Sequence, residues 1–116
     1  MNESETGKGF SYWRICVKGE TLLIELEESK RESWKIIWRR QDGTSEQCGY
    51  LDTPDDELTE AQREEADEPV SDEFFALINE TEAHNGDFIY KLHEDERISR
   101  EEFYRSWNGN PSPTLP

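Results

Sequence analysis

Apolar residues alternate with polar ones in three runs within the first forty residues of this chain. Residues 10–17, 21–27 and 34–39 each repeat an apolar side chain at every second position, which is the period of a strand with one buried face. Gly19 separates the first two runs, and the pair Asp42 and Gly43, a strong hairpin signal, follows the third. The pattern therefore predicts consecutive antiparallel strands joined by tight turns.

The alternation also assigns side chains to the two faces of the predicted sheet. Lys35, Ile37 and Arg39 are expected on the outer face, away from the two tryptophans of the third run. A fourth strand through Cys48 and Tyr50 would complete a four-stranded antiparallel β-meander. The positions expected to face the core are Trp13, Ile15, Val17, Leu22, Ile24, Leu26, Trp34, Ile36 and Trp38.

Helix signals replace strand signals after residue 51. Thr53 can cap a helix, Pro54 suits its first turn, and the carboxylates that follow suit the positive end of the helix dipole. This helix is expected to run to about Asp67, although few of its residues are apolar. A second helix, capped by Ser71 and ending near Gly86, is expected to pack on the sheet. Its apolar stripe consists of Phe74, Phe75, Leu77 and Ile78.

Two further elements are expected before the chain ends. Residues 88–92 are aromatic and β-branched and are interpreted as a fifth strand. Ser99 and Glu102 then form a capping box, and the spacing of Ile98 and Phe103 matches a hydrophobic staple, which together predict a short last helix. The expected fold class is α+β: a four-stranded antiparallel β-meander followed by two or three helices and a candidate fifth strand.

The length of 116 residues suits one domain. The chain is divided into a flexible N-terminal segment (1–9), a single α+β domain (10–108) and a Pro-rich tail (109–116). There is no apolar run long enough for a membrane helix and no signal-peptide pattern, so a cytoplasmic protein with no membrane partner is expected. In that compartment Cys16 and Cys48 are expected to be free thiols.

The strongest charge feature is the acidic segment, residues 52–73. It contains eleven carboxylates and one base, Arg63, and therefore carries −10 of the net charge of −15. Such a field attracts a cationic partner and repels nucleic acid and anionic lipid over a Debye length of roughly 8 Å. The carboxylates are Asp52, Asp55, Asp56, Glu57, Glu60, Glu64, Glu65, Asp67, Glu68, Asp72 and Glu73.

Four of these carboxylates recur every four residues in the helix expected after residue 54. Asp56, Glu60, Glu64 and Glu68 would form one row with neighbours roughly 6 Å apart, close to the phosphate spacing of a nucleic-acid strand. Each like-charged pair weakens a helix by about 0.2–0.5 kcal/mol, so the row costs on the order of 1 kcal/mol. This cost favours a role in binding over the alternative of a solvated helix face.

These observations predict a small acidic binding protein that inhibits or neutralises a basic protein partner with a carboxylate-rich surface. Two versions fit: an immunity or antitoxin protein directed at a nuclease toxin, and a nucleic-acid mimic directed at a nucleic-acid-binding protein. The alternative is an accessory or scaffold domain whose acidic segment is only solvated. The predicted partner-binding residues are Asp52, Asp55, Asp56, Glu57, Glu60, Glu64, Glu65, Asp67 and Glu68, with Tyr50 and Trp107 as candidate aromatic anchors.

Other function classes find little support in the sequence. It has two histidines and no nucleophile, phosphate-loop or dinucleotide motif, so neither an enzyme nor a cofactor is expected. Glu80 and His84 are too few ligands for a metal site. Direct nucleic-acid binding is not expected, because Lys35 and Arg39 point away from the neighbouring tryptophans and are interpreted as balancing the protein's own carboxylates. The oligomeric state stays open.

Overall fold

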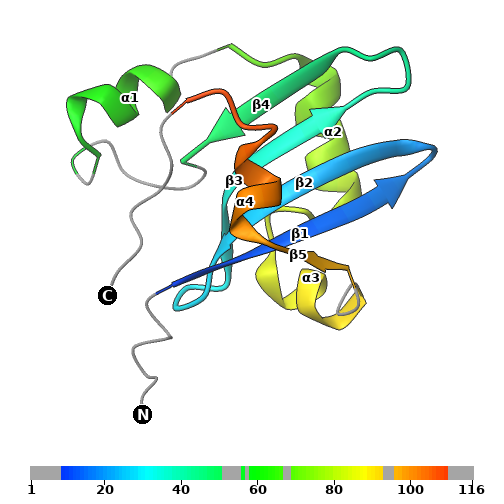
Figure 1. The fold of residues 1–116 in the computed structure, drawn as a ribbon, viewed down its shortest axis with the longest axis horizontal. Coiled ribbons are helices and arrows are strands. Elements are labelled where there is room, and N and C mark those ends of the chain that lie inside the picture. Colours follow the sequence, from blue (N-terminus) through cyan, green and yellow to red (C-terminus); the bar gives the residue numbers. More distant parts are fainter. Residues whose placement is uncertain (1–8, 51–55, 57, 67–68, 93–95, 110–116) are drawn as a thin grey trace.

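The computed structural model describes residues 9–50, 56, 58–66, 69–92 and 96–109. Five strands form one antiparallel sheet in the order β4-β3-β2-β1-β5, with helices on both faces (Figure 1), so the chain has the predicted α+β fold. Apart from Gly9 and Gly109, the predicted N-terminal segment and Pro-rich tail lie outside the described residues. The strands are β1 (Phe10–Val17), β2 (Glu20–Glu27), β3 (Glu32–Arg39), β4 (Ser45–Gly49) and β5 (Arg97–Ile98).

The predicted hairpin turns are confirmed. Between β1 and β2, Lys18 and Gly19 have φ values of 53° and 80°, the left-handed pair that a two-residue hairpin turn requires. Between β3 and β4, Gly43 has a φ of 92°, and the Asp42 side chain accepts hydrogen bonds from the N–H and the hydroxyl of Thr44. Local turn chemistry therefore sets the register of the meander.

One face of the sheet is covered by α2 (Asp72–Thr81) and α3 (Gly86–Leu92), drawn behind the strands in Figure 1. Ser71 caps α2 as predicted: its Oγ accepts from Phe74 N–H at 3.2 Å. Phe75, expected in the apolar stripe, is instead 47% exposed. This first core contains Trp13, Ile15, Leu22, Ile24, Leu26, Ile36, Trp38, Phe74, Ile78, Ala83 and Ile89.

The other face is covered by α4 (Arg100–Tyr104) and the residues that follow it. Ser99 caps α4 as predicted, accepting from Glu102 N–H at 3.0 Å, while the Glu102 carboxylate pairs with Arg14. This second core contains Tyr12, Leu23, Ile37, Phe103 and Trp107. A sheet with both faces covered explains why the predicted outer face also contains the apolar residues Tyr12, Leu23 and Ile37.

The prediction that Trp34 shares a face with Ile36 and Trp38 is wrong. The pairing of β2 with β3 shifts register between Glu25 and Leu26, which pair with Lys35 and Ser33, so Trp34 is the extra residue of a bulge. Its ring contacts Phe10 and Tyr50 on the second face. The bulge changes the alternation that the sequence pattern assumed.

The prediction of a strand over residues 88–92 is also wrong, because these residues belong to α3. Asn85 supports the start of this helix by accepting from Asp87 N–H, and Gly86 lies against the main chain of Arg31. Ile89 of this helix is fully buried in the first core, while Phe88 is 41% exposed. The fifth strand is β5, which pairs with Tyr12 and Trp13 of β1.

The first helix begins later than predicted. α1 spans Glu60–Ala66, and Leu58 and Thr59 before it are not helical, whereas residues 53–55, 57 and 67 of the predicted helix lie outside the described residues. Thr59 Oγ1 accepts from Gln62 N–H at 3.1 Å, and Gln62 Oε1 accepts from Thr59 N–H at 2.9 Å, which is a complete capping box. The predicted four-residue row is therefore reduced to Glu60 and Glu64 within the helix, because Asp56 precedes it and Glu68 lies outside the described residues.

Candidate functional site

The helix α1 lies outside both cores, beside the edge strand β4 (Figure 1). None of its own residues is buried, whereas Leu58, which precedes it, is buried. Its attachment to the sheet includes Tyr50, which follows β4 with a φ of 61° and donates from its hydroxyl to Glu65 Oε1 at 3.0 Å. A helix with this little burial contributes little to the stability of the fold, so packing does not constrain its sequence.

The carboxylates of this region that the structure describes differ in their surroundings. Asp56, Glu60 and Glu64 are exposed, and within the described part of the chain none of them has an ion-pair partner. Glu65 is half-buried and belongs to the attachment described above. The predicted site residues Asp52, Asp55, Glu57, Asp67 and Glu68 lie outside the described residues.

Cations of the chain pair with carboxylates away from α1. Arg14 pairs with Glu102, Lys18 with Glu80 and Arg97 with Glu28. Arg40 pairs with Glu46. These four cations therefore pair with carboxylates of the sheet and its turns, of α2 and of α4, and none of these pairs involves the exposed carboxylates of α1.

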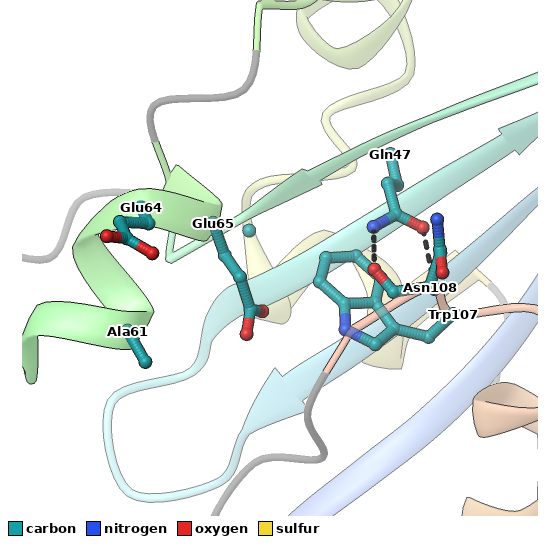
Figure 2. Close-up of a pocket in the computed structure, with 7 residues that line it drawn as sticks. Gln47, Ala61, Glu64, Glu65, Trp107 and Asn108 are labelled. Atoms are coloured by element: carbon teal, nitrogen blue, oxygen red, sulfur yellow. Dashed lines mark hydrogen bonds between the residues drawn. The ribbon is translucent and has the colours of Figure 1, made fainter.

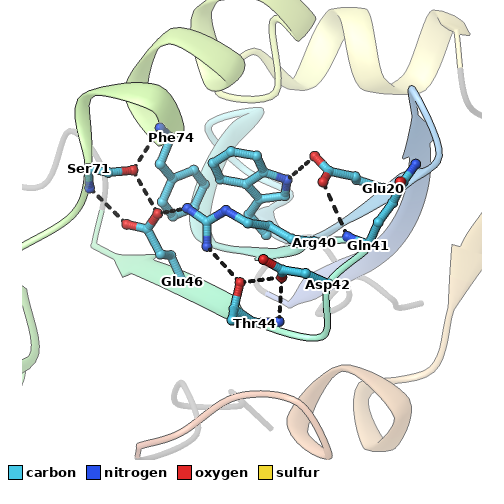
Figure 3. Close-up of polar contacts among 9 residues, drawn as sticks. Glu20, Arg40, Gln41, Asp42, Thr44, Glu46, Ser71 and Phe74 are labelled. Atoms are coloured by element: carbon cyan, nitrogen blue, oxygen red, sulfur yellow. Dashed lines mark hydrogen bonds and ion pairs between the residues drawn. The ribbon is translucent and has the colours of Figure 1, made fainter.

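The Arg40 pair also holds α2 on the sheet (Figure 3). Glu46 of β4 accepts from the N–H of Ser71 at 2.8 Å and from its hydroxyl at 2.6 Å, while it pairs with Arg40. The Arg40 guanidinium lies 4.0 Å from the ring centroid of Trp38, whose Nε1–H donates to Glu20. These contacts agree with the expectation that Arg40 balances the protein's own carboxylates.

A buried lysine lies behind the attachment of α1. Lys35 of β3 is fully buried, and its Nζ lies 4.5 Å from the ring centroid of Trp107 and 5.2 Å from those of Tyr50 and Tyr104. These distances are within the range of cation–π attraction. We call Lys35 and these three rings the lysine cage. The alternation of the sequence placed Lys35 on the outer face of the sheet, but aromatic rings enclose it there.

Glu25 of β2 is the cross-strand partner of Lys35 and is equally buried. It accepts from the hydroxyls of Tyr12, at 3.0 Å, and Tyr104. Burial lowers the pKa of Lys35 to about 8, although the Glu25 and Glu65 carboxylates oppose this shift. Burial and the neighbouring Glu25 raise the pKa of the Tyr12 hydroxyl, which keeps it a hydrogen-bond donor.

Sequence analysis did not identify Lys35 and Glu25 as site residues. Leu23 lies two positions from Glu25, and Ile37 two positions from Lys35, so all four share the face predicted to point outward. The two apolar residues on that face were the available signal that another element covers it. Tyr50 and Trp107, the predicted aromatic anchors, are brought together by the lysine cage and are 4% and 7% exposed. Their part in partner binding stays a prediction.

A cavity of about 340 Å³ separates α1 from β4 and the end of the described chain (Figure 2). The Gln47 side chain closes one wall by pairing with the main chain of Asn108: it donates to the carbonyl at 2.6 Å and accepts from the N–H at 2.9 Å. The residues that line the cavity are Gln47, Gly49, Ala61, Glu64, Glu65, Trp107 and Asn108. Acidic side chains and the edge of an indole ring thus border one opening.

Comparison with protein-family models, curated proteins and solved structures gives no match, so this site is interpreted from its own geometry. Within the described ranges, no cluster of three or more His, Cys, Asp or Glu side chains could hold a metal ion. No helix among the described residues has the length and apolar character needed to cross a bilayer.

Proposed function

We propose that this chain is a small acidic binding protein that inhibits a basic protein partner, a nuclease or another nucleic-acid-binding protein, by presenting the carboxylates of α1 to its cationic cleft. The observation that carries this proposal is α1 itself. The helix is capped and attached to the sheet, yet it buries no residue, and its exposed Glu60 and Glu64 have no ion-pair partner among the described residues. A helix with a purely structural role would bury an apolar stripe of side chains against the core.

The lysine cage supports the proposal from inside the domain. It brings Tyr50 next to Glu65, so that α1 is attached through a polar contact at its inner side while Glu60 and Glu64 stay exposed. Pre-organised charges raise the rate of association with an oppositely charged partner and make this rate depend on ionic strength. A helix held against a rigid sheet meets this requirement better than a free acidic segment, because less conformational entropy is lost on binding.

The proposal is tested by capture of partners from the native host at low and high ionic strength, followed by association kinetics with the captured protein. A nuclease or nucleic-acid-binding protein that salt releases supports inhibition, and its identity separates the immunity version from the mimic version. The double variant E60K/E64K should slow association by roughly tenfold or more at low salt. The control E32K/E101K makes the same change of net charge at exposed positions away from α1 and should have a much smaller effect.

Two results would count against the proposal. Equal association rates for E60K/E64K and E32K/E101K would mean that only net charge matters and that α1 is no binding surface. Partners that stay bound at high salt would favour the scaffold alternative, in which the acidic segment is only solvated.

A further inference from the structure

The cavity beside α1 is lined by a tryptophan whose indole donor finds no acceptor among the described residues. The indole Nε1–H of Trp107 is buried and has no hydrogen-bond partner in the part of the chain that the structure describes, although the residue is only 7% exposed. The rest of the ring packs against Lys35 and Phe103. A buried donor without an acceptor destabilises the protein, so a ligand that supplies an acceptor at this point binds more tightly.

Two carboxylates of α1 line the same cavity as this donor (Figure 2). Glu64 is exposed and without an ion-pair partner in the described chain, and Glu65 extends from α1 toward the indole. A Cβ placed on Gly109 would lie 2.9 Å from Trp107 Nε1 and 3.0 Å from Glu65 Oε1. Gly109 therefore packs closely against both polar atoms, and a side chain at this position would collide with them.

A ligand for this cavity has to accept from the indole N–H and donate to carboxylates at the same time. A Lys or Arg side chain alone carries donors only, and a carboxylate or phosphate carries acceptors that Glu64 and Glu65 repel. A peptide segment with a basic side chain supplies both, because its main-chain carbonyl accepts while its ammonium or guanidinium donates. The exposed, unpaired Glu60 and Glu64 favour such a cation over a neutral amide.

We infer that the cavity binds a basic peptide segment of the partner, with a main-chain carbonyl oxygen on Trp107 Nε1 and a Lys or Arg side chain against Glu64. This inference rests on the proposed function and adds to it the point where the partner is anchored. The surface carboxylates of α1 then provide steering, and the cavity provides the short-range contact that slows dissociation.

The inference is tested by NMR titration of the full-length ¹⁵N-labelled chain with the blocked tripeptide acetyl-Gly-Arg-Gly-amide. The chain has four tryptophans, and the W107F variant assigns the indole signal of Trp107. This signal should move downfield saturably on titration, as expected for an N–H that gains an acceptor. The E64Q variant should weaken tripeptide binding by about three- to fivefold, whereas E101Q, an exposed carboxylate on α4, should bind like the original chain.

Two further probes separate the parts of the ligand. Methylguanidinium carries the charge without the carbonyl and should leave the Trp107 indole signal in place, and acetyl-Gly-Gln-Gly-amide carries the carbonyl without the charge and should bind more weakly. Equal binding of the Gln and Arg peptides, or an unmoved Trp107 signal, overturns the inference. If salt-sensitive capture of a basic partner persists in that case, the proposed function stands and only the anchor point is lost.

Discussion

Lys35 and Glu25 face each other across β3 and β2, and both side chains are completely buried on the second face of the sheet. The aromatic rings of Tyr50, Tyr104 and Trp107 surround the lysine, and tyrosine hydroxyls donate to the carboxylate. The free-energy cost of desolvating these two opposite charges is thus offset by their attraction and by these contacts. The stability of each buried charge therefore depends on the presence of the other.

Removal of one member of this pair should cost far more than removal of both. K35M and E25Q are each expected to lower the free energy of unfolding by about 3–5 kcal/mol, because each removes one of two opposite charges that attract each other in a buried site. The double variant K35M/E25Q should cost clearly less than the sum of the two. Urea denaturation of the four proteins measures this coupling, and additive losses would show that the two charges do not depend on each other.

The stability of the protein should rise between about pH 8 and pH 10. Folded Lys35 loses its proton near pH 8, whereas an unfolded lysine loses it near 10.5, so the unfolded state binds more protons in this range and the free energy of unfolding increases with pH. Above about pH 10 the raised pKa values of Tyr12 and Tyr50 reverse the slope, because the folded state keeps protons that unfolded tyrosines lose. Denaturation at stepwise pH measures the curve. K35M should lack the rise, and an identical slope in this variant would contradict the assignment to Lys35.

The Tyr50 hydroxyl should hold α1 in place without supporting the fold as a whole. Y50F removes the hydrogen bond to Glu65 and should speed amide exchange in α1 by about three- to tenfold, corresponding to a hydrogen bond of about 0.5–1.5 kcal/mol. Y104F is the matched control, because the Tyr104 hydroxyl donates to Glu25 and not to α1. Faster exchange of α1 in Y104F alone, or in neither variant, would rule out this attachment.

The start of α2 should depend on Glu46 as well as on its own cap. S71A removes the side chain that accepts from Phe74 N–H and should cost about 1 kcal/mol. E46Q should also destabilise, because the carboxylate accepts from Ser71 twice and pairs with Arg40. The two losses should be less than additive in S71A/E46Q, as measured by urea denaturation, with S45A of β4 as an exposed control. Full additivity would mean that Glu46 does not act through Ser71.

Features that depend on a few neighbouring residues could be predicted from the sequence. The turns at Gly19 and Gly43 and the caps at Ser71 and Ser99 follow from φ preferences and side-chain hydrogen bonds that reach at most three residues along the chain. The prediction for residues 88–92 was wrong because a five-residue run with four apolar or aromatic side chains fits a strand as well as a helix. The prediction of where α1 begins was wrong because Thr53 and Thr59 are both plausible caps, and only Thr59 has a glutamine three residues later.

The sequence by itself determined the meander, the caps of α2 and α4 and the excess of carboxylates in residues 52–73, because these depend on local periodicity, on neighbouring side chains and on composition. Only the tertiary structure decided where the charges lie. The bulge at Trp34 arises from the pairing of β2 with β3, and the burial of Lys35 requires α4 and Trp107, which come more than sixty residues later in the chain. The hydrophobic periodicity of one segment does not show which distant segment it contacts. The lysine cage and the cavity beside it form only when the second face of the sheet is covered.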